Sequence, residues 1–387
     1  MESEEAMVRH LVEQGYTPIS IEEESKSVAE TLRPMASLFK GKVSDRDISF
    51  FSRQFVTLVK AGIPLVSTLQ TLQEQTQNKA LHRVLSFVIA DVEKGESLGE
   101  ALAKHPQVFS ELYIAMIRTG EASGQLESVL SRLAEMGEYE ANVKAQVKTA
   151  TFYPKLILGV MFLAFLFITT FILPRFTAIF EQAGVDLFVT TKFLLWLNFV
   201  LRRYWYLAIA FVVLSIFGIR FFLKTPFGRD LWDRTQLKLP VFGTLFSQFV
   251  LSRFARTLSV TTKHNLPILE ALDIVSRSVG NTLVSKEVLR IRESVSRGEG
   301  ISRPMKEGKV FPPLVVKMVS VGEETGKLDE LLMRVSEHFD FEVDNAIKKL
   351  TVLIEPVLLV ILGGMVLFLI LSIFVPLLSF YTKIAKG

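Results

Sequence analysis

The chain of 387 residues contains one pattern twice, a domain length apart. Gly62-Ile-Pro-Leu corresponds to Asn265-Leu-Pro-Ile, and Val92-Glu-Lys-Gly-Glu to Val295-Ser-Arg-Gly-Glu, both at an offset of 203 residues. After one residue is lost the offset becomes 202 and holds for three further pairs: Gly120-Glu-Ala-Ser-Gly-Gln-Leu with Gly322-Glu-Glu-Thr-Gly-Lys-Leu, Pro154 with Pro356, and Pro174 with Pro376. A match sustained over about 125 positions indicates an internal repeat. Any fold must therefore hold two equivalent units.

Two apolar runs occupy equivalent places after the two copies. Leu156 to Leu173 has 18 residues without a charge, and Val357 to Val375 has 19. A helix needs about 20 residues to cross a hydrocarbon core, so both runs predict transmembrane helices. The composition agrees, because 49% of the residues are hydrophobic and 31 are Phe, which has a large apolar area and no polar atom.

A third span is required if both copies lie on one side of the membrane and each is followed by a span. Tyr204 to Leu223 is the candidate, since the long Arg220 side chain can reach the interface. The shorter apolar run Phe193 to Leu201 predicts an interfacial helix. The predicted order is 1–44 N-terminal segment and linker, 45–153 first cytoplasmic domain, 154–174 first span, 175–203 external loop with the interfacial helix, 204–223 second span, 224–355 second cytoplasmic domain, 356–376 third span, and 377–387 external tail.

Basic residues near the predicted spans favour a cytoplasmic location for both copies, because Lys and Arg accumulate on that side. Ten lie on the proposed cytoplasmic side and six on the other: Lys144, Lys148, Lys155, Arg220, Lys224, Arg229, Arg234, Lys238, Lys348 and Lys349 against Arg175, Lys192, Arg202, Arg203, Lys383 and Lys386.

Both copies have helical periodicity. Apolar residues recur every three or four positions from Leu126 to Val147 and from Leu328 to Phe339, which is typical of one face of a long helix. Sustained period-two alternation is absent from the sequence. The predicted fold class is all-α: a multi-pass membrane protein with two homologous cytoplasmic helical-bundle domains of about six helices each and three transmembrane helices.

The ordered, duplicated motifs resemble a known family. The Gly-Ile-Pro-Leu turn at Gly62, the Lys-Gly-Glu segment at Lys94 and the Gly-Glu-x-x-Gly-x-Leu corners at Gly120 and Gly322, with a proline-bracketed span after each copy, are similar to inner-membrane platform proteins of type II secretion systems and type IV pili. The resemblance covers about residues 45–387. The residues around Leu11 to Ile21 are similar to the end of the family's N-terminal segment, whose strand-forming part is missing here, so we expect a truncated start.

That resemblance implies a multi-pass protein of the bacterial inner membrane. The missing catalytic motifs and the replacement of Lys327 by Gln125 in the other copy predict that it is not an enzyme. The resemblance also implies coupling of a cytoplasmic hexameric ATPase to the insertion of pilins or pseudopilins into a growing filament. The expected partners are this ATPase, the pilins, other inner-membrane assembly proteins, the lipid bilayer and further copies of the chain, with no nucleic acid bound directly and no cofactor.

The Gly-rich corner allows three interpretations. A phosphate loop is one, but the spacing between Gly322 and Gly326 is one residue too short, and Gln125 replaces Lys327 in the other copy. A helix corner is the second: Gly120 or Gly322 would end one helix in a left-handed conformation, and the next would begin with an acid in its first turn and an inward-packing Leu. The third is a partner contact through the paired acids. The candidate residues are Gly120, Glu121, Gly124, Leu126, Gly322, Glu323, Gly326 and Leu328.

The residues where the first and third spans begin are Pro154, Lys155, Glu355 and Pro356. They are candidates for an element that senses a pilin helix; the alternative is interfacial anchoring, with each proline at or near the start of a helix. Gly363 and Gly364 would allow close packing of another helix.

Catalytic and metal chemistry have little support. The sequence has no Cys, and its five His residues have no ligand spacing. A weak divalent-cation site at Glu121 and Glu127 stays open. An oligomeric transporter or permease subunit is the alternative function, although three mostly uncharged spans offer few polar groups for a pathway. A membrane-anchored enzyme would need a catalytic site, and no nucleophile, base and acid arrangement stands out.

Overall fold

The computed structural model describes residues 42–182, 188–239, 242–308 and 310–384. Within these ranges the regular elements are helices and no strand is present, which confirms the predicted all-α class. Of the predicted segment 1–44 only residues 42–44 are described, and the last residues of the predicted tail 377–387 lie outside the described ranges.

The first helical unit is formed by α4 to α8 and the start of α9. Side chains cap several of its helices by accepting hydrogen bonds from free backbone N–H groups, as Ser44 does for α4 and Asn78 for α6. Fully buried side chains such as Phe55 and Leu85 form the core. The bounds are α4 Asp45–Lys60, α5 Leu65–Gln75, α6 Lys79–Glu93, α7 Leu98–Ala103, α8 Glu111–Ser123 and α9 Leu126–Phe167.

The second helical unit repeats this order with α13 to α17 and the start of α18. Asn281 caps α15 as Asn78 caps α6, and Gly326 follows α17 in a left-handed conformation as Gly124 follows α8. The sequence repeat is therefore a repeat of structure. The bounds are α13 Phe242–Lys263, α14 Ile268–Ser278, α15 Thr282–Ser296, α16 Ser302–Glu307, α17 Pro313–Thr325 and α18 Leu328–Ile384.

The two units pack directly against each other through different faces. Val260, Leu266 and Ile274 of the second unit are buried in the core of the first. Salt bridges flank this contact, with 3.1 Å between Arg277 Nη1 and Glu111 Oε1 and 3.0 Å between Arg253 Nε and Glu140 Oε1. The first unit thus contributes α8 and α9, whereas the second contributes α13 and α14.

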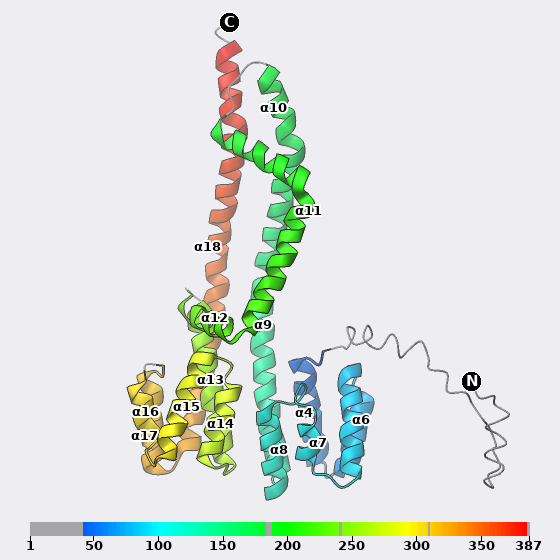
Figure 1. Ribbon diagram of the computed structural model, residues 1–387, viewed down its shortest axis with the longest axis vertical. Coiled ribbons are helices and arrows are strands. Elements are labelled where there is room, and N and C mark those ends of the chain that lie inside the picture. The colour runs from blue at the N-terminus through cyan, green and yellow to red at the C-terminus, as the bar shows by residue number, and fades with distance from the viewer. Residues whose placement is uncertain (1–41, 183–187, 240–241, 309, 385–387) are drawn as a thin grey trace, which may run out of the picture.

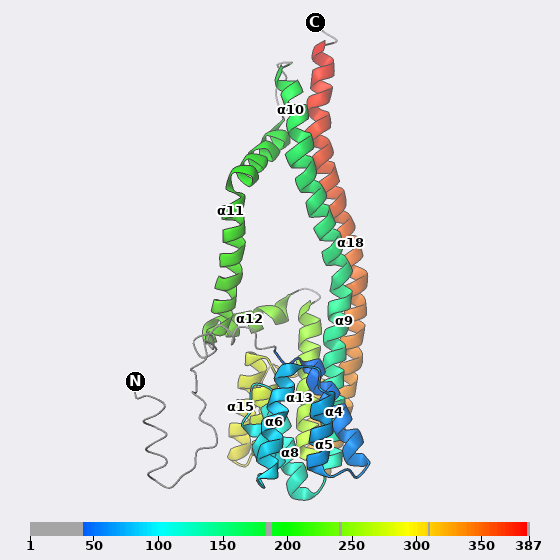
Figure 2. The same cartoon turned by 90° about the vertical axis from the view of Figure 1, so that its right-hand side faces the viewer.

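Each unit continues into a long helix, and the two helices run side by side away from the units (Figures 1 and 2). α9 is followed by the π-helical turn η2 (Ile168–Ile172) and α10 (Leu173–Gln182), while α18 has 57 residues. Pro154 and Pro356 lie inside these helices, so the expectation that a helix begins at or near each of them is wrong. An interior proline removes one backbone hydrogen bond, and here the helices continue through it.

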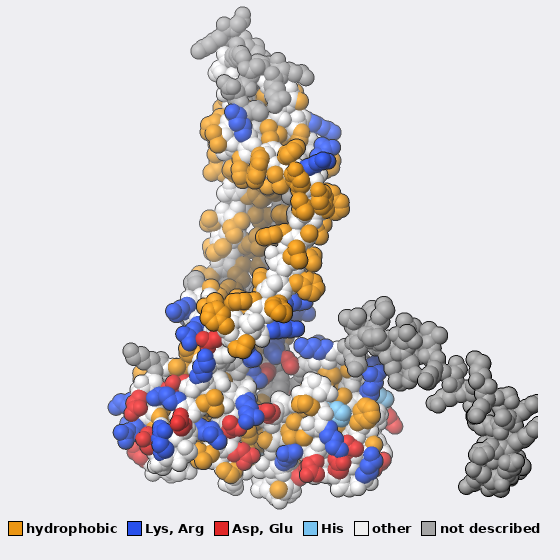
Figure 3. All heavy atoms as spheres, in the orientation of Figure 1, with side chains coloured by type: hydrophobic (Ala, Val, Ile, Leu, Met, Phe, Trp, Pro, Cys, Tyr) orange, Lys and Arg blue, Asp and Glu red, His pale blue; other side chains and the backbone are white. Residues whose placement is uncertain are grey.

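Three helices of the described chain are long and apolar enough to cross a membrane. The segments are Leu126–Phe180, Arg202–Lys224 and Leu328–Ser379. The apolar part of each carries exposed hydrophobic side chains, and the most apolar window of the second has no buried residue. Figure 3 shows this apolar region above two lobes rich in charged side chains.

α11 (Val189–Lys224) returns from the far end of the long helices toward the units and bends at Tyr204, where φ is −121° and ψ is 23°. The sequence predicted separate helices at 193–201 and 204–223, and the non-helical backbone at Tyr204 divides α11 into two helical segments at this place, the first of which already begins at Val189. The interfacial position of this first segment stays a prediction. The first segment packs against η2 and α18, and Leu194 is fully buried with Leu173 and Leu369. α12 (Pro226–Lys238) then leads to α13.

α11 also supplies hydrogen-bond donors that two prolines remove from the long helices. Pro376 has no N–H for the carbonyl of Ser372, and Thr191 Oγ1 donates to that carbonyl at 2.6 Å. In the π-helical turn the carbonyl of Thr169 would accept from residue 174, which is Pro174, and Asn198 Nδ2 donates to it at 2.7 Å. An unpaired carbonyl in an apolar environment is costly, so these two side chains fix where α11 crosses α10 and α18.

Candidate functional site

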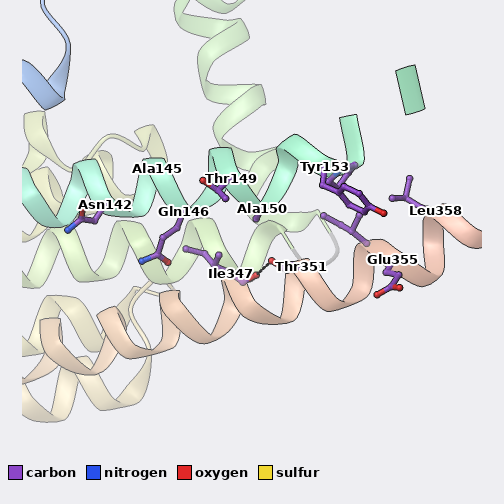
Figure 4. Close-up of a pocket in the computed structure, with 12 residues that line it drawn as sticks. Asn142, Ala145, Gln146, Thr149, Ala150, Tyr153, Ile347, Thr351, Glu355 and Leu358 are labelled. Atoms are coloured by element: carbon purple, nitrogen blue, oxygen red, sulfur yellow. Dashed lines mark hydrogen bonds between the residues drawn. The ribbon is translucent and has the colours of Figure 1, made fainter. Parts of the chain in front are cut away.

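A cleft of about 710 Å³ lies between α9 and α18 where their apolar runs begin at Leu156 and Val357. Figure 4 shows the residues that line it. On the α9 side small residues such as Ala145 and Ala150 leave room opposite Ile347. Beside the cleft the two helices pack on each other and on α13 through an apolar cluster that includes Val143, Val343 and Leu350. The lining residues are Asn142, Ala145, Gln146, Thr149, Ala150, Tyr153, Pro154, Ile347, Thr351, Ile354, Glu355 and Leu358.

The cleft has a polar end and an apolar end. Asn142 and Gln146 lie toward the helical units, and Tyr153 and Leu358 lie toward the apolar segments (Figure 4). Glu355 places a carboxylate on the α18 side. These groups suit an apolar ligand with a polar or positively charged end.

The carbonyl of Ala150 is a further acceptor, because Pro154 has no N–H to donate to it. Ala150 and Pro154 both line the cleft. The lining therefore includes apolar side chains, the acid Glu355 and a residue whose carbonyl has lost its usual partner within the helix. The N-terminal end of a helix, with free N–H groups and partial positive charge, has the complementary chemistry.

Of the four predicted residues at the starts of the spans, the structure brings Pro154 and Glu355 together in this cleft. Lys155 and Pro356 are not among its lining residues, and Lys155 Nζ lies 3.4 Å from Thr151 Oγ1 on its own helix. At Gly363 and Gly364 an added Cβ would meet no atom within 4 Å, so both present open surface on α18.

The glycine corners differ from the prediction in where the helices end. Gly120 and Gly322 lie inside α8 and α17, and the left-handed residues are Gly124 (φ 67°) and Gly326 (φ 70°). The prediction that Gly120 or Gly322 ends the helix is therefore wrong.

Gly120 and Gly322 instead allow close approach of the following helix. A Cβ at Gly322 would lie 2.9 Å from the Cα of Leu328, and one at Gly120 would lie 3.2 Å from the Cα of Leu126. Any larger residue would push these helices apart. Leu126 and Leu328 pack against the cores of their own units.

The paired corner acids bind backbone within their own units. Glu121 accepts hydrogen bonds from the N–H groups of Leu98 and Gly99, both at 2.7 Å, where α7 begins. Glu323 accepts from Ile301 and from Ser302, the latter at 2.9 Å, at the start of α16. Carboxylates are favourable at helix N-termini, so these acids tie each short helix to the next long one. The geometry explains both acids without a partner protein.

We expect Glu121→Ala to lower the free energy of unfolding by about 2 kcal/mol, because it removes two charge-assisted hydrogen bonds. Thermal unfolding of the purified protein in detergent measures the change. Glu127→Ala is the matched control, since this exposed acid on the same corner pairs with Lys60 at 3.8 Å across solvent-exposed surface. Equal effects of the two substitutions would contradict the assignment.

An ion pair between an arginine and an acid is also present in both copies, and the sequence motifs did not identify it. Arg53 pairs with Glu138 between α4 and α9, and Arg256 pairs with Asp340 between α13 and α18. The Arg53 hydrogen bond holds the pKa of Glu138 below its usual value. In the second unit Arg256 also lies 4.5 Å from the ring centroid of Tyr139 in α9. Comparison of the two copies at the repeat offsets would have found both pairs.

The last question about this site is whether its side chains could bind a metal ion. Among the described residues no group of three or more His, Cys, Asp or Glu side chains is placed to hold a metal ion.

Comparison with known proteins adds the family. A family model described as "Type II secretion system (T2SS), protein F" matches residues 51–174 and again residues 254–376, which together exceed half of the chain. The chain belongs to this family. Its two matches start 203 residues apart and end 202 residues apart, so they coincide with the two copies of the repeat.

Relatives carry names from both machines of this family. The chain is 34% identical to "Type IV pilus assembly protein PilC" of Myxococcus xanthus over 97% of this chain and 89% of that protein. It is 35% identical to the protein of the same name from Thermus thermophilus, over 95% and 90% respectively. It is 30% identical to "Type II secretion system protein F" of Vibrio cholerae, over 96% and 91%. The protein F family therefore supports a role in a pilus or secretion assembly system.

The sequence motifs indicated the family, but they did not predict the cleft between α9 and α18. A signal was nevertheless present, because Asn142, Gln146, Thr149 and Tyr153 follow one another at four, three and four residues. This spacing places polar groups on one face of a helix immediately before an apolar run.

Proposed function

We propose that the chain is an inner-membrane platform protein that couples a cytoplasmic hexameric ATPase to the insertion of pilins or pseudopilins into a filament. Both helical units lie in the cytoplasm, and the apolar parts of α9, α11 and α18 cross the bilayer. The exposed apolar surface of these helices supports insertion, since a soluble protein rarely exposes so large an apolar area. The family names of the relatives support the assembly role.

The observation that carries the proposal is the cleft between α9 and α18. In the proposed orientation it opens where the cytoplasm meets the membrane, and it receives the end of a pilin's hydrophobic helix. Glu355 and the carbonyl of Ala150 bind donors at the helix end, while Tyr153 and Leu358 contact its apolar side chains.

The energy for insertion comes from the partner ATPase. The corner that resembles a phosphate loop lacks the required spacing, and its acids Glu121 and Glu323 bind backbone N–H groups of their own units. The chain therefore transmits motion produced elsewhere, and a direct contact between the corner acids and the motor is not needed.

Site-directed cross-linking tests the proposal, and the absence of Cys makes any introduced thiol unique. We expect Thr149→Cys and Thr351→Cys to form disulfides with a Cys placed near the N-terminus of the co-expressed pilin. Ser123→Cys, at an exposed position beside the corner of the first unit, is the control and should form none. Equal cross-linking at all three positions, or none during active assembly, would rule out the cleft as the docking site.

Glu355→Gln tests the same site by function. We expect about tenfold less filament or secreted product, because a hydrogen bond to a charged group contributes roughly 1.5–3 kcal/mol. Complementation of a deletion strain measures the product, with protein level in the membrane recorded in parallel. Glu337→Gln, an exposed acid elsewhere on α18, is the matched control. Wild-type output from Glu355→Gln would contradict the role given to the carboxylate.

A further inference from the structure

α12 lies across the foot of α11, between the apolar helix and the second helical unit (Figures 1 and 2). We propose that α12 is an interfacial helix that binds the surface of an anionic phospholipid bilayer and fastens the second unit to it. This inference rests on the membrane orientation proposed above and adds a lipid-binding surface to it.

The direction of α12 is fixed by its two ends. Thr225 caps it by accepting from the N–H of Gly228 at 3.1 Å, and Pro226 occupies its first position. Gly228 approaches α11 so closely that a Cβ would lie 2.1 Å from the carbonyl oxygen of Phe222. At the other end a Cβ on Gly243 would lie 2.4 Å from the carbonyl oxygen of Leu237. Both bends therefore require glycine, and α12 cannot continue the line of α11.

One face of α12 is acidic and binds the second unit. Asp233 is buried, and its Oδ2 accepts from the N–H of Thr282 at 2.8 Å, at the start of α15. Asp230 Oδ1 accepts from Lys286 Nζ at 2.7 Å on the same helix. Both acids thus bind the N-terminal part of α15, and Asp230 also pairs with Arg234 of α12, with 3.0 Å between Oδ2 and Nη2.

The rest of α12 exposes apolar and basic side chains. Phe227 is 72% exposed, Leu231 49% and Trp232 45%, although the helix is only 13 residues long. Large apolar side chains on a short polar helix need a partner, since water disfavours them. Lys224, Arg229, Arg234 and Lys238 are the basic residues of this segment, and all four are exposed.

A bilayer surface fits this combination better than a protein groove. The apolar residues of α12 follow directly on exposed Phe221 and Phe222 of α11. The exposed apolar surface therefore continues from the proposed transmembrane helix onto α12, which would lie in the plane of the membrane surface. Trp is favoured at the boundary between lipid and water, and basic residues attract anionic headgroups. At about 1.5 Å per residue α12 is too short to span a bilayer. The acids that anionic lipid would repel face α15 instead.

Depth-dependent fluorescence quenching of the full-length protein in vesicles tests the inference. Trp196→Phe with Trp205→Phe leaves Trp232 as the single Trp, and both replaced side chains are exposed. In vesicles of phosphatidylcholine and phosphatidylglycerol we expect lipids brominated near the headgroup to quench about half of the Trp232 emission, and lipids brominated near the chain end to quench less. Trp232 quenched by aqueous iodide and by neither lipid would overturn the inference.

A second variant separates this inference from the proposed function. Trp196→Phe with Trp232→Phe leaves Trp205, which lies in the apolar segment of α11. Quenching of Trp205 by brominated lipid without quenching of Trp232 rejects the lipid contact of α12 and leaves membrane insertion standing. Quenching of neither residue overturns both.

The anionic part of the proposal has its own test. Quenching of Trp232 should be about twofold stronger with phosphatidylglycerol present than in pure phosphatidylcholine, and Arg229→Gln with Lys238→Gln should remove that difference. Equal quenching of the unsubstituted helix in both lipids would overturn the role of the basic residues.

Discussion

Asp340→Ala is expected to lower the midpoint of thermal unfolding by about 4 °C, which corresponds to about 3 kcal/mol for a chain of 387 residues. The carboxylate pairs with Arg256 and accepts from Ser252, so it joins α18 to α13 at two points. The Arg256 side chain is only 15% exposed, and the substitution would leave its charge without its partner in a place that water hardly reaches. Circular dichroism of the purified protein in detergent measures the midpoint.

The first copy of the repeat contains the matched control. Glu138 and Arg53 form the equivalent pair, but their side chains are 36% and 47% exposed. Glu138→Ala should therefore cost less than about 1 kcal/mol, because water screens an exposed pair. Arg256→Met with Asp340→Leu should recover most of the loss, since an apolar pair can replace a buried ion pair. Equal losses for Asp340→Ala and Glu138→Ala would show that burial does not decide the effect.

Thr191→Val is expected to destabilise the protein by about 1–3 kcal/mol, since it leaves the buried carbonyl of Ser372 without a donor. The size and shape of the side chain barely change, so the effect isolates the hydroxyl group. In a Pro376→Ala background the same substitution should cost much less, because alanine at this position supplies the missing N–H within α18. The four proteins form a double-mutant cycle that can be measured by reversible unfolding in detergent.

The same logic applies to Asn198 and Pro174, where the carbonyl of Thr169 is the acceptor. If Thr191→Val cost the same in the unsubstituted chain and in the Pro376→Ala background, the hydroxyl would act through packing, and the explanation of the crossing of α11 would be wrong.

The sequence predicted the class of the fold because its evidence was long-range and redundant. The offset between Gly124 and Gly326 and the three apolar runs are visible without coordinates, and the structure places equivalent helices there. The boundary at Tyr204 was also visible in the sequence, because Arg202-Arg203 interrupts the apolar pattern, and the structure has non-helical backbone angles at Tyr204.

The site was harder to predict because it depends on which surfaces meet. Pro154 and Glu355 were identified as separate residues beside two spans, and the packing of α9 on α18 brings them into one cleft. Glu121 attracted a partner hypothesis because an acid in a glycine-rich corner looks exposed in the sequence. Its partners are backbone N–H groups at Leu98 and Gly99, and backbone groups have no sequence signal.

The contact between the two helical units has a consequence for how copies of the chain meet. It joins unlike faces, so the first unit retains a free face equivalent to the one that the second unit uses, and a contact of this type can in principle add subunits without end. At the positions equivalent to Val260 and Ile274 that free face carries Thr57 and Thr71, which weaken such an addition, whereas Ile63 at the position of Leu266 is still apolar. This difference between the copies therefore disfavours open-ended association of the protein through this face. A closed assembly would have to form through other surfaces.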